Sequence, residues 1–288
     1  METLKFTVVV DNNVPPGAKV PFRGEHGLSL LIETGTNRIL FDAGPSDIVV
    51  YNLGLLGLHP RDLDAIILSH GHYDHTGGLP SVLHMANKSL PIFSHPEIFK
   101  KRYSVADGKC RYVGIPFSSD YLASLGADFR PVEEATELLP NLWISGPVPR
   151  ETSYENGDDR LVIPEDGCEC CVPAGPFLKD DLMDDMALYV RSAKGLVVLG
   201  GCAHSGIINM VNHGLKVTGS IKVHGLLGGT HLGPTSESQQ NATLAALEWF
   251  NPDFVASNHC TGFSVMSKLS HSFGQKFIPA FCGTVIEC

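Results

Sequence analysis

No stretch of this 288-residue sequence is apolar for long enough to cross a membrane, and no run of basic residues stands out. The first ten residues, METLKFTVVV, are too short and too strand-like for a secretory signal. Acidic residues outnumber basic ones by 31 to 21. These features argue against a membrane or nucleic-acid partner. We expect a cytoplasmic protein that acts on a small-molecule substrate, and a homodimer remains an open alternative.

The sequence also has no internal repeat and no clear domain boundary, so we expect a single domain over residues 1–288. Residues 146–176 are rich in glycine, proline and acidic residues. A stretch like this inside a compact domain is typical of a functional loop. We therefore predict a lid-like insertion at about residues 100–180.

Eight cysteines are present, and in a cytoplasmic protein thiols or metal ligands are more common than disulfides. Three of them form the cluster CECC, at Cys168, Cys170 and Cys171. This cluster would suit a soft metal or an iron–sulfur group, but no fourth cysteine lies close in the sequence. We interpret the cluster as a group of loop thiols.

The segment DAIILSHGHYDHTGGL, residues 64–79, carries the densest group of polar side chains. Its apolar run Ala65–Leu68 predicts a buried strand, and the glycines that follow predict a tight turn. Four side chains of the kind that bind metals follow within six residues: His70, His72, Asp74 and His75. Alternate residues of an extended segment share a face, so His70 and His72 point the same way. The pattern predicts a metal site, with Asp74 and His75 aimed at a second ion.

Three later strands are expected to end in the same manner, with glycine or a polar residue and then histidine or cysteine. GLVVLGG is followed by Cys202 and His204, residues 221–227 by His231, and Phe254–Ser257 by His259. Strand ends that meet at one edge of a sheet can assemble a site from distant parts of the chain. This repeated pattern favours a single site that contains these four side chains.

A hairpin near the N-terminus places one more histidine. Strands over Leu28–Ile32 and Ile39–Phe41 flank a turn, so the start of the first lies beside the end of the second. His26 should therefore lie near Asp42. His26 is a candidate for substrate contact at the mouth of the site, and a loop histidine without a role is the equal alternative.

HGHYDH matches the HxHxDH signature of the metallo-β-lactamase superfamily. This resemblance implies an α/β protein with an αββα four-layer sandwich and a one- or two-metal site at one edge of its two sheets. The chain also contains EHGLS, ILFDAG, DDMAL, GCAHSGIIN, GGTHL and NHCTGF. This wider set resembles the branch labelled 7,8-dihydropterin-6-methyl-4-(β-D-ribofuranosyl)aminobenzene-5′-phosphate synthase.

The resemblance implies roles for three residues outside the HGHYDH motif. Asp42, in ILFDAG, would lie beneath the metals and orient a histidine ligand. Cys202 stands where the superfamily has an aspartate that bridges two metals, and a thiolate also binds zinc or iron. His259 matches the final histidine ligand.

The sequence departs from the superfamily pattern in one place. The usual histidine before the MALYV strand is missing, and the matching position is Asp181, with Asp184 and Asp185 nearby. We expect His204 to replace the missing histidine, because an imidazole keeps the site rich in nitrogen. Asp181 is the alternative ligand.

We therefore expect a metal-dependent hydrolase, or a related enzyme, that acts on a phosphorylated or pterin-like molecule through a metal-activated water. The cofactor would be one or two divalent ions, zinc first and iron or manganese as alternatives. The assignment of ligands is His70, His72 and His204 for one ion, and Asp74, His75 and His259 with Cys202 for the other. Asp74 is also the candidate general base, and His231 joins His26 as a substrate contact.

Two other functions compete with this one. An iron-binding redox protein, diiron or iron–sulfur, is favoured by Cys202, Cys260 and the CECC cluster. A metal-free binding module on the same fold is disfavoured by the intact HGHYDH motif.

Overall fold

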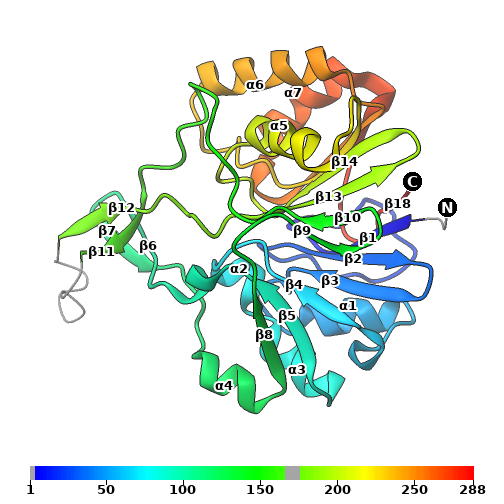
Figure 1. The fold of residues 1–288 in the computed structure, drawn as a ribbon, viewed down its shortest axis with the longest axis vertical. Coiled ribbons are helices and arrows are strands. Elements are labelled where there is room, and N and C mark those ends of the chain that lie inside the picture. The colour runs from blue at the N-terminus through cyan, green and yellow to red at the C-terminus, as the bar shows by residue number, and fades with distance from the viewer. Residues whose placement is uncertain (1–3, 166–175) are drawn as a thin grey trace.

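The computed structural model describes residues 4–165 and 176–288. Two seven-stranded sheets pack face to face, and helices cover the outer face of each (Figure 1). The prediction of an αββα sandwich is confirmed. The CECC cluster, Cys168 to Cys171, lies outside the described residues.

The first sheet joins the N-terminal part of the chain to its last strand. Its strands in spatial order are β18 (Val285–Glu287), β1 (Leu4–Val10), β2 (Ser29–Thr34), β3 (Asn37–Phe41), β4 (Ala65–Ile67), β5 (Leu90–Ser94) and β8 (Ala127–Pro131). β2 and β3 form the predicted hairpin, in which Leu30 pairs with Phe41. β3 and β4 run parallel. Their carboxyl ends, which lead to Asp42 and to the HGHYDH motif, therefore lie at the same edge.

The second sheet is built from the C-terminal half, with two strands from residues 136–144 at its edge. Its order is β17 (Phe277–Pro279), β16 (Phe254–Ser257), β15 (Val223–Gly228), β14 (Gly195–Gly200), β13 (Ala187–Ser192), β10 (Leu142–Ile144) and β9 (Thr136–Leu139). β14, β15 and β16 are parallel neighbours. The residues that follow these three strands consequently emerge side by side.

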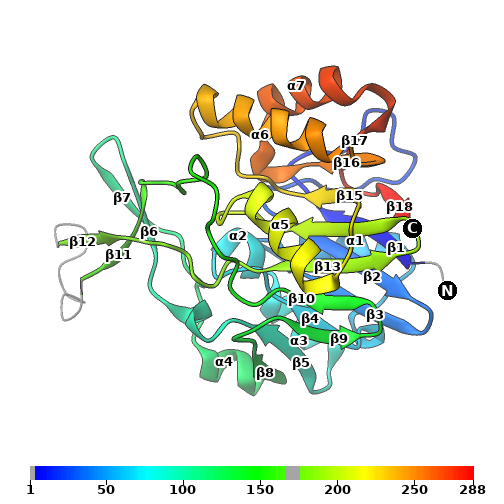
Figure 2. The ribbon, with the colours of Figure 1, turned by 45° about the horizontal axis from the view of Figure 1, so that its top comes forward.

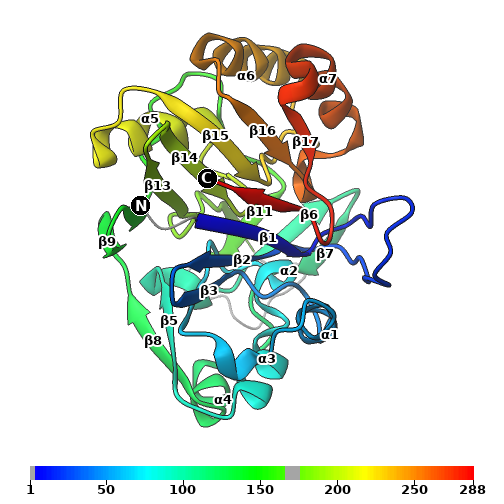
Figure 3. The same ribbon diagram turned by 90° about the vertical axis from the view of Figure 1, so that its right-hand side faces the viewer.

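Helices cover the outer faces of the sandwich, as the view in Figure 3 shows. On the first sheet lie α1 (Ile48–Leu55), α3 (Leu79–Ala86) and α4 (Ser119–Ser124), and on the second α5 (Ile207–Thr218), α6 (Glu237–Phe250) and α7 (Phe263–Phe273). The one-turn helix α2 (Tyr73–Thr76) continues from the histidine motif. Among the described residues, no helix has the length and apolar character that a membrane crossing requires.

Strand β13 illustrates why both sheets are apolar on both faces. Leu188 and Val190 belong to the apolar cluster between the sheets, whereas Ala187 and Tyr189 belong to the cluster under the helices. All four side chains are buried, because each face of the strand is covered. The near-continuous apolar runs in the sequence follow from this double coverage.

A third, four-stranded sheet stands beside the sandwich (Figures 1 and 2). Its order is β12 (Phe177–Lys179), β11 (Leu161–Pro164), β6 (Tyr103–Ala106) and β7 (Lys109–Tyr112). The insertion predicted at about residues 100–180 is therefore discontinuous. Residues 119–144 contain α4, β8, β9 and β10, which belong to the main sandwich rather than to an insertion.

The segment between β10 and β11 is fastened to the second sheet by buried polar contacts. Glu155 accepts hydrogen bonds from the backbone N–H groups of Ile208 and Asn209, at 2.9 and 3.0 Å, and so caps the first turn of α5. Arg150 donates to the carbonyl oxygen of His204 at 2.8 Å. The described part of the predicted lid is thus held in place, and residues 166–175 lie outside the description.

Candidate metal centre

Four strand ends bring the predicted polar residues together at one edge of the sandwich. His70 and His72 follow β4, Cys202 and His204 follow β14, and His259 follows β16. Their side chains are buried, which is unusual for so many ionisable groups in one place. His231, after β15, completes the set, and its ring centroid lies 4.2 Å from that of His204.

Three histidines form the first potential ligand group. One ring nitrogen from each of His70, His72 and His204 lies within 4.8 Å of the others. His72 Nε2 and both ring nitrogens of His204 are buried without a hydrogen-bond partner. Burying such groups unpaired is costly, so a cation that accepts their lone pairs fits these residues.

A second group lies beside the first. Asp74, His75 and His259 offer ligand atoms within 4.8 Å of one another, and His75 Nε2 is 3.2 Å from His259 Nε2. Cys202 Sγ is 3.2 Å from His75 Nε2, and it also forms a group with His70 and His75. Cys202 therefore lies between the two groups, where the resemblance places a bridging ligand.

Asp42 orients ligands in both groups from beneath. Its Oδ2 atom lies 2.7 Å from His75 Nδ1 and accepts a hydrogen bond from Ser69 Oγ, also at 2.7 Å. Ser69 Oγ in turn lies 2.8 Å from His70 Nδ1. An ionised carboxylate only accepts hydrogen bonds, so His75 carries its proton on Nδ1 and keeps the Nε2 lone pair for an ion.

His259 has an orienting shell that the sequence did not reveal. Asn12 Oδ1 lies 3.0 Å from His259 Nδ1, and Asp11 Oδ1 accepts the backbone N–H of His259 at 2.8 Å. Both residues come from the turn after β1. These contacts leave His259 Nε2 facing the centre.

The electrostatics of the centre suit neutral imidazole ligands. Burial first, and then neighbouring cationic groups, lower the pKa of His70, His72, His204 and His259 well below the ordinary value. Neutral imidazole is the form that binds metals.

The pKa values of His75 and His231 are raised rather than lowered. Burial lowers the pKa of His75, but the carboxylates of Asp42 and Asp74 outweigh it and raise that pKa to about 9. Hydrogen bonds with Asp158 and Cys260 similarly overcome burial at His231 and raise its pKa to about 9. The acidic groups around these rings attract positive charge, which suits a divalent cation.

Two thiols meet at the centre, and only one of them was assigned as a ligand from the sequence. Burial raises the pKa of Cys202 well above its ordinary value. At Cys260 burial acts in the same direction, but hydrogen bonds with Cys202 and His231, together with the charge of His231, lower the pKa to about 5. Nitrogen, sulfur and carboxylate donors together favour a borderline metal such as zinc or iron.

The aspartates before β13 contact other groups. Asp184 accepts from the backbone N–H of Gly71 at 2.8 Å and from Arg102 at 2.7 Å. Asp185 accepts from the N–H and hydroxyl of Ser205, both at 2.7 Å. Asp181 is exposed. The carboxylates of Asp184 and Asp185 thus hold the loops that carry the histidines. His204 clusters with His70 and His72, and its role as the ligand stays a prediction.

A cavity of about 410 Å³ opens above the ligands. His72, Asp74, Cys202, His204, His231, His259 and Cys260 line its floor, and Tyr73, Ser104, Arg111, Val113, Asp158, Arg160 and Leu161 line its wall. His26 lies at the mouth, with Nε2 3.4 Å from Asp74 Oδ2 and a side chain 60% exposed. Much of the wall comes from the small third sheet, which therefore shapes the space available to a substrate.

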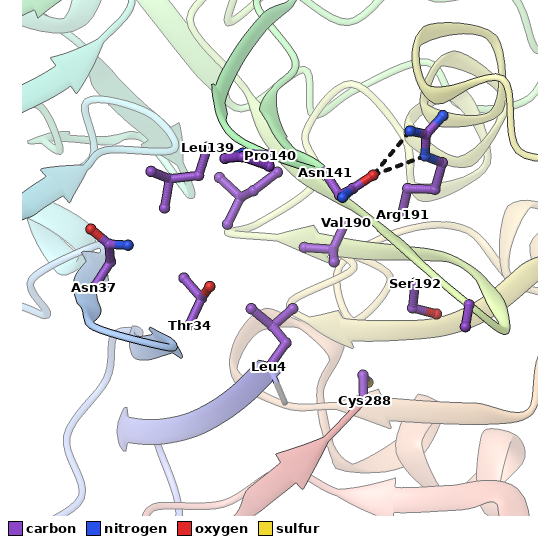
Figure 4. A pocket seen from close by; sticks show the side chains of 12 residues that line it. Leu4, Thr34, Asn37, Leu139, Pro140, Asn141, Val190, Arg191, Ser192 and Cys288 are labelled. Carbon is purple, nitrogen blue, oxygen red and sulfur yellow. Dashed lines mark hydrogen bonds between the residues drawn. The ribbon is translucent and has the colours of Figure 1, made fainter. Parts of the chain in front are cut away.

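A larger cavity, about 480 Å³, lies at the opposite end of the strands (Figure 4). It is lined by the start of β1, the β2–β3 turn and residues 190–193. Its Arg191 is held by Asn141 Oδ1 through two hydrogen bonds, of 3.1 and 3.0 Å. None of the clusters of three or more potential metal-binding side chains in the described part of the chain lines this cavity.

Comparisons with known proteins agree with this architecture. The sequence profile of the Metallo-beta-lactamase superfamily matches residues 23–100. The chain is 31% identical over 278 residues to the 7,8-dihydropterin-6-methyl-4-(beta-D-ribofuranosyl)-aminobenzene-5′-phosphate synthase of Methanocaldococcus jannaschii, covering 94% of this chain and 92% of that protein. It is 34% identical over 280 residues to an uncharacterised protein of the same organism, covering 97% and 98%. A crystal structure of a metal-dependent hydrolase of the beta-lactamase superfamily matches with a TM-score of 0.81 and 26% identity over 99% of both chains.

Proposed function

Since this chain belongs to the metallo-β-lactamase superfamily, we propose that it is a metal-dependent hydrolase, or a closely related enzyme, that acts on a small phosphorylated or pterin-like molecule. The observation that carries this proposal is the set of buried ring nitrogens without partners at His72 and His204, on the floor of a cavity. Zinc is the first candidate for the metal, because nitrogen and sulfur donors predominate.

The proposed mechanism assigns separate tasks to the residues of the centre. His70, His72 and His204 would hold one divalent ion, and His75, His259 and Cys202 a second. A divalent ion at such a site lowers the pKa of a bound water to roughly 7 and polarises the bond under attack.

Asp74 lies at the edge of these groups. Its Oδ2 atom is 3.5 Å from His259 Nε2 and faces the cavity. From this place it would accept the proton that the attacking water loses. His26 is close enough to Asp74 to relay that proton towards the solvent.

Arg111 gives the cavity wall a site for an anion. Its guanidinium group donates to the hydroxyl of Tyr73 at 3.2 Å and meets no carboxylate in the described part of the chain. Arg160, by contrast, is already paired with Asp158. A phosphate or carboxylate on the substrate would give Arg111 a charged partner, since arginine binds such groups through two parallel hydrogen bonds.

The test combines metal analysis with a substrate screen. Elemental analysis of the purified protein should find one or two divalent ions per chain, and the screen should include phosphodiesters, lactones, thioesters and pterin phosphates. Arg111→Ala should raise KM for an anionic substrate by roughly 10- to 100-fold with little change in metal content, because a charged hydrogen bond is lost. Arg130→Ala is the matched control, because Arg130 is exposed, pairs with Asp128 and does not line the cavity. Protein without metal, or an equal KM in both variants, would contradict the proposal.

An iron-binding redox protein is the second candidate. The second thiol at the centre, Cys260, favours it, because thiolates also bind iron. Visible absorption bands of a diiron or iron–sulfur centre in the purified protein would support this alternative over the hydrolase.

A further inference from the structure

Cys260 is a thiol at the centre that none of the roles above uses. It is half-buried, lines the cavity floor and directly follows His259. Cys202 Sγ, Cys260 Sγ and a ring nitrogen of His259 lie within 4.8 Å of one another. A tetrahedral ion with sulfur ligands at ~2.3 Å separates its ligand atoms by roughly 3.5–4 Å, so only small movements are needed for binding.

We propose that Cys260 is a second sulfur ligand, and that the ion held by His259 takes thiolates from both Cys202 and Cys260. This inference rests on the proposed function, because it concerns the same centre. Both sulfurs would bind as thiolates, so any proton that they carry before binding passes to solvent.

The surroundings of Cys260 are arranged as they are around metal-bound sulfur. Its Sγ accepts the backbone N–H of His231 at 3.2 Å. Such a hydrogen bond stabilises negative charge on sulfur and fixes the direction of its lone pairs. The sulfur also lies 3.5 Å from the carbonyl oxygen of Cys202. That contact is favourable only for a protonated thiol, and metal binding would remove it.

The backbone leaves space for this close approach at Gly229. A Cβ atom there would lie 2.7 Å from Cys260 Sγ and 2.4 Å from the carbonyl oxygen of Gly201. Only glycine therefore allows the ends of β14, β15 and β16 to come together with both sulfurs at one place.

The ligand count gives the proposal a chemical consequence. His75, His259, Cys202 and Cys260 together supply four nitrogen and sulfur donors, the number that zinc prefers. This set of four is complete without Asp74, which agrees with the role in proton transfer proposed for that residue. Two thiolates would also shift the preference of this binding site towards soft metals.

Cobalt substitution tests the sulfur count directly. Thiolate ligands give Co(II) proteins a near-ultraviolet charge-transfer band, and its intensity follows the number of sulfurs bound. Cys202→Ser and Cys260→Ser should each reduce this band, Cys260→Ser by about half, because one of two sulfur ligands is lost. Cys110→Ser, on β7 and outside the centre, is the control and should match the native chain.

The outcomes separate this inference from the proposed function. An unchanged band in Cys260→Ser would overturn the second sulfur ligand while leaving a metalloenzyme. A native chain that binds no cobalt would instead overturn the proposed function itself.

A second measurement uses the native chain and does not depend on how the variants fold. Zinc should protect Cys260 from alkylation, as read by mass spectrometry, and removal of zinc with a chelator should expose it. Cys110 should react in both states. Equal labelling of Cys260 with and without zinc would also overturn the proposal.

Discussion

Replacing Asp42 with asparagine should reverse the proton position on His75 while keeping the volume of the side chain. Asp42 Oδ1 accepts the N–H of Ser69 at 2.7 Å, and Oδ2 faces His75 Nδ1. If the amide oxygen of asparagine keeps the Ser69 contact, its NH₂ group faces His75. His75 Nδ1 must then accept a hydrogen bond, so the proton moves to Nε2 and blocks the lone pair meant for the ion.

The size of the effect follows from the number of ligands disturbed. Loss of an orienting partner typically lowers metal affinity by about 10- to 100-fold. That corresponds to roughly 1.4–2.8 kcal/mol of binding free energy. For Asp42→Asn we expect the upper end, because Ser69 Oγ links the same carboxylate to His70 and both ligand groups are disturbed.

Competition between the protein and a fluorescent zinc chelator measures this loss, with the two binding steps fitted separately. Ser69→Ala is the comparison variant. It removes the Ser69 hydroxyl contacts to His70 and to Asp42 but leaves the carboxylate facing His75, so it should weaken the first group more than the second. Circular dichroism confirms that the variants are folded. If Asp42→Asn binds zinc in two steps that are as tight as those of the native chain, the proposed position of the proton on His75 is wrong.

Three further outcomes are expected. His70→Ala combined with His72→Ala should abolish binding of at least one ion, and unchanged metal content by elemental analysis would reject HGHYDH as the nucleus of the site. Gly229→Ala should lower the free energy of unfolding by about 1–3 kcal/mol, because the added methyl group overpacks a tight contact, and denaturant unfolding measures this. Burial raises the pKa of Glu155, so its folded pKa exceeds the unfolded one and the native chain should lose stability relative to Glu155→Gln as pH rises through the folded pKa. Thermal unfolding measures this. A difference in melting temperature between the native chain and Glu155→Gln that stays constant across this pH range would contradict the prediction.

The sequence was most informative where a local pattern had a local cause. The apolar run before His70 predicted β4, and the pattern of histidines predicted where these polar side chains meet. The hairpin argument expected the start of β2 beside the end of β3, and the N–H of Gly44 donates to the carbonyl oxygen of Leu28 at 3.0 Å. His26 itself lies 3.4 Å from Asp74. The ligand roles themselves remain predictions until a metal-bound form is measured.

Features that depend on distant partners could not be predicted. Asn12 and His259 are 247 residues apart, and nothing in the turn after β1 indicates that its side chains orient a histidine. The small third sheet was missed because its strands are short. β6 and β7 contain no buried residue, so they lack the alternation that marks a half-buried strand. Its attachment through Arg102 and Asp180, at 2.8 Å, likewise joins residues 78 positions apart.

The pairing of β18 with β1 has a consequence for how the chain reaches this structure. Lys5 lies opposite Glu287, so β1 pairs on one side with a strand that follows it by about 280 residues in the sequence. During synthesis β1 remains an open edge until the residues of β18 leave the ribosome, and contacts of such long sequence separation form slowly. The N-terminal half therefore cannot finish folding ahead of the rest. A nascent chain stalled before residue 285 should stay sensitive to protease and dependent on chaperones, despite already containing every proposed metal ligand.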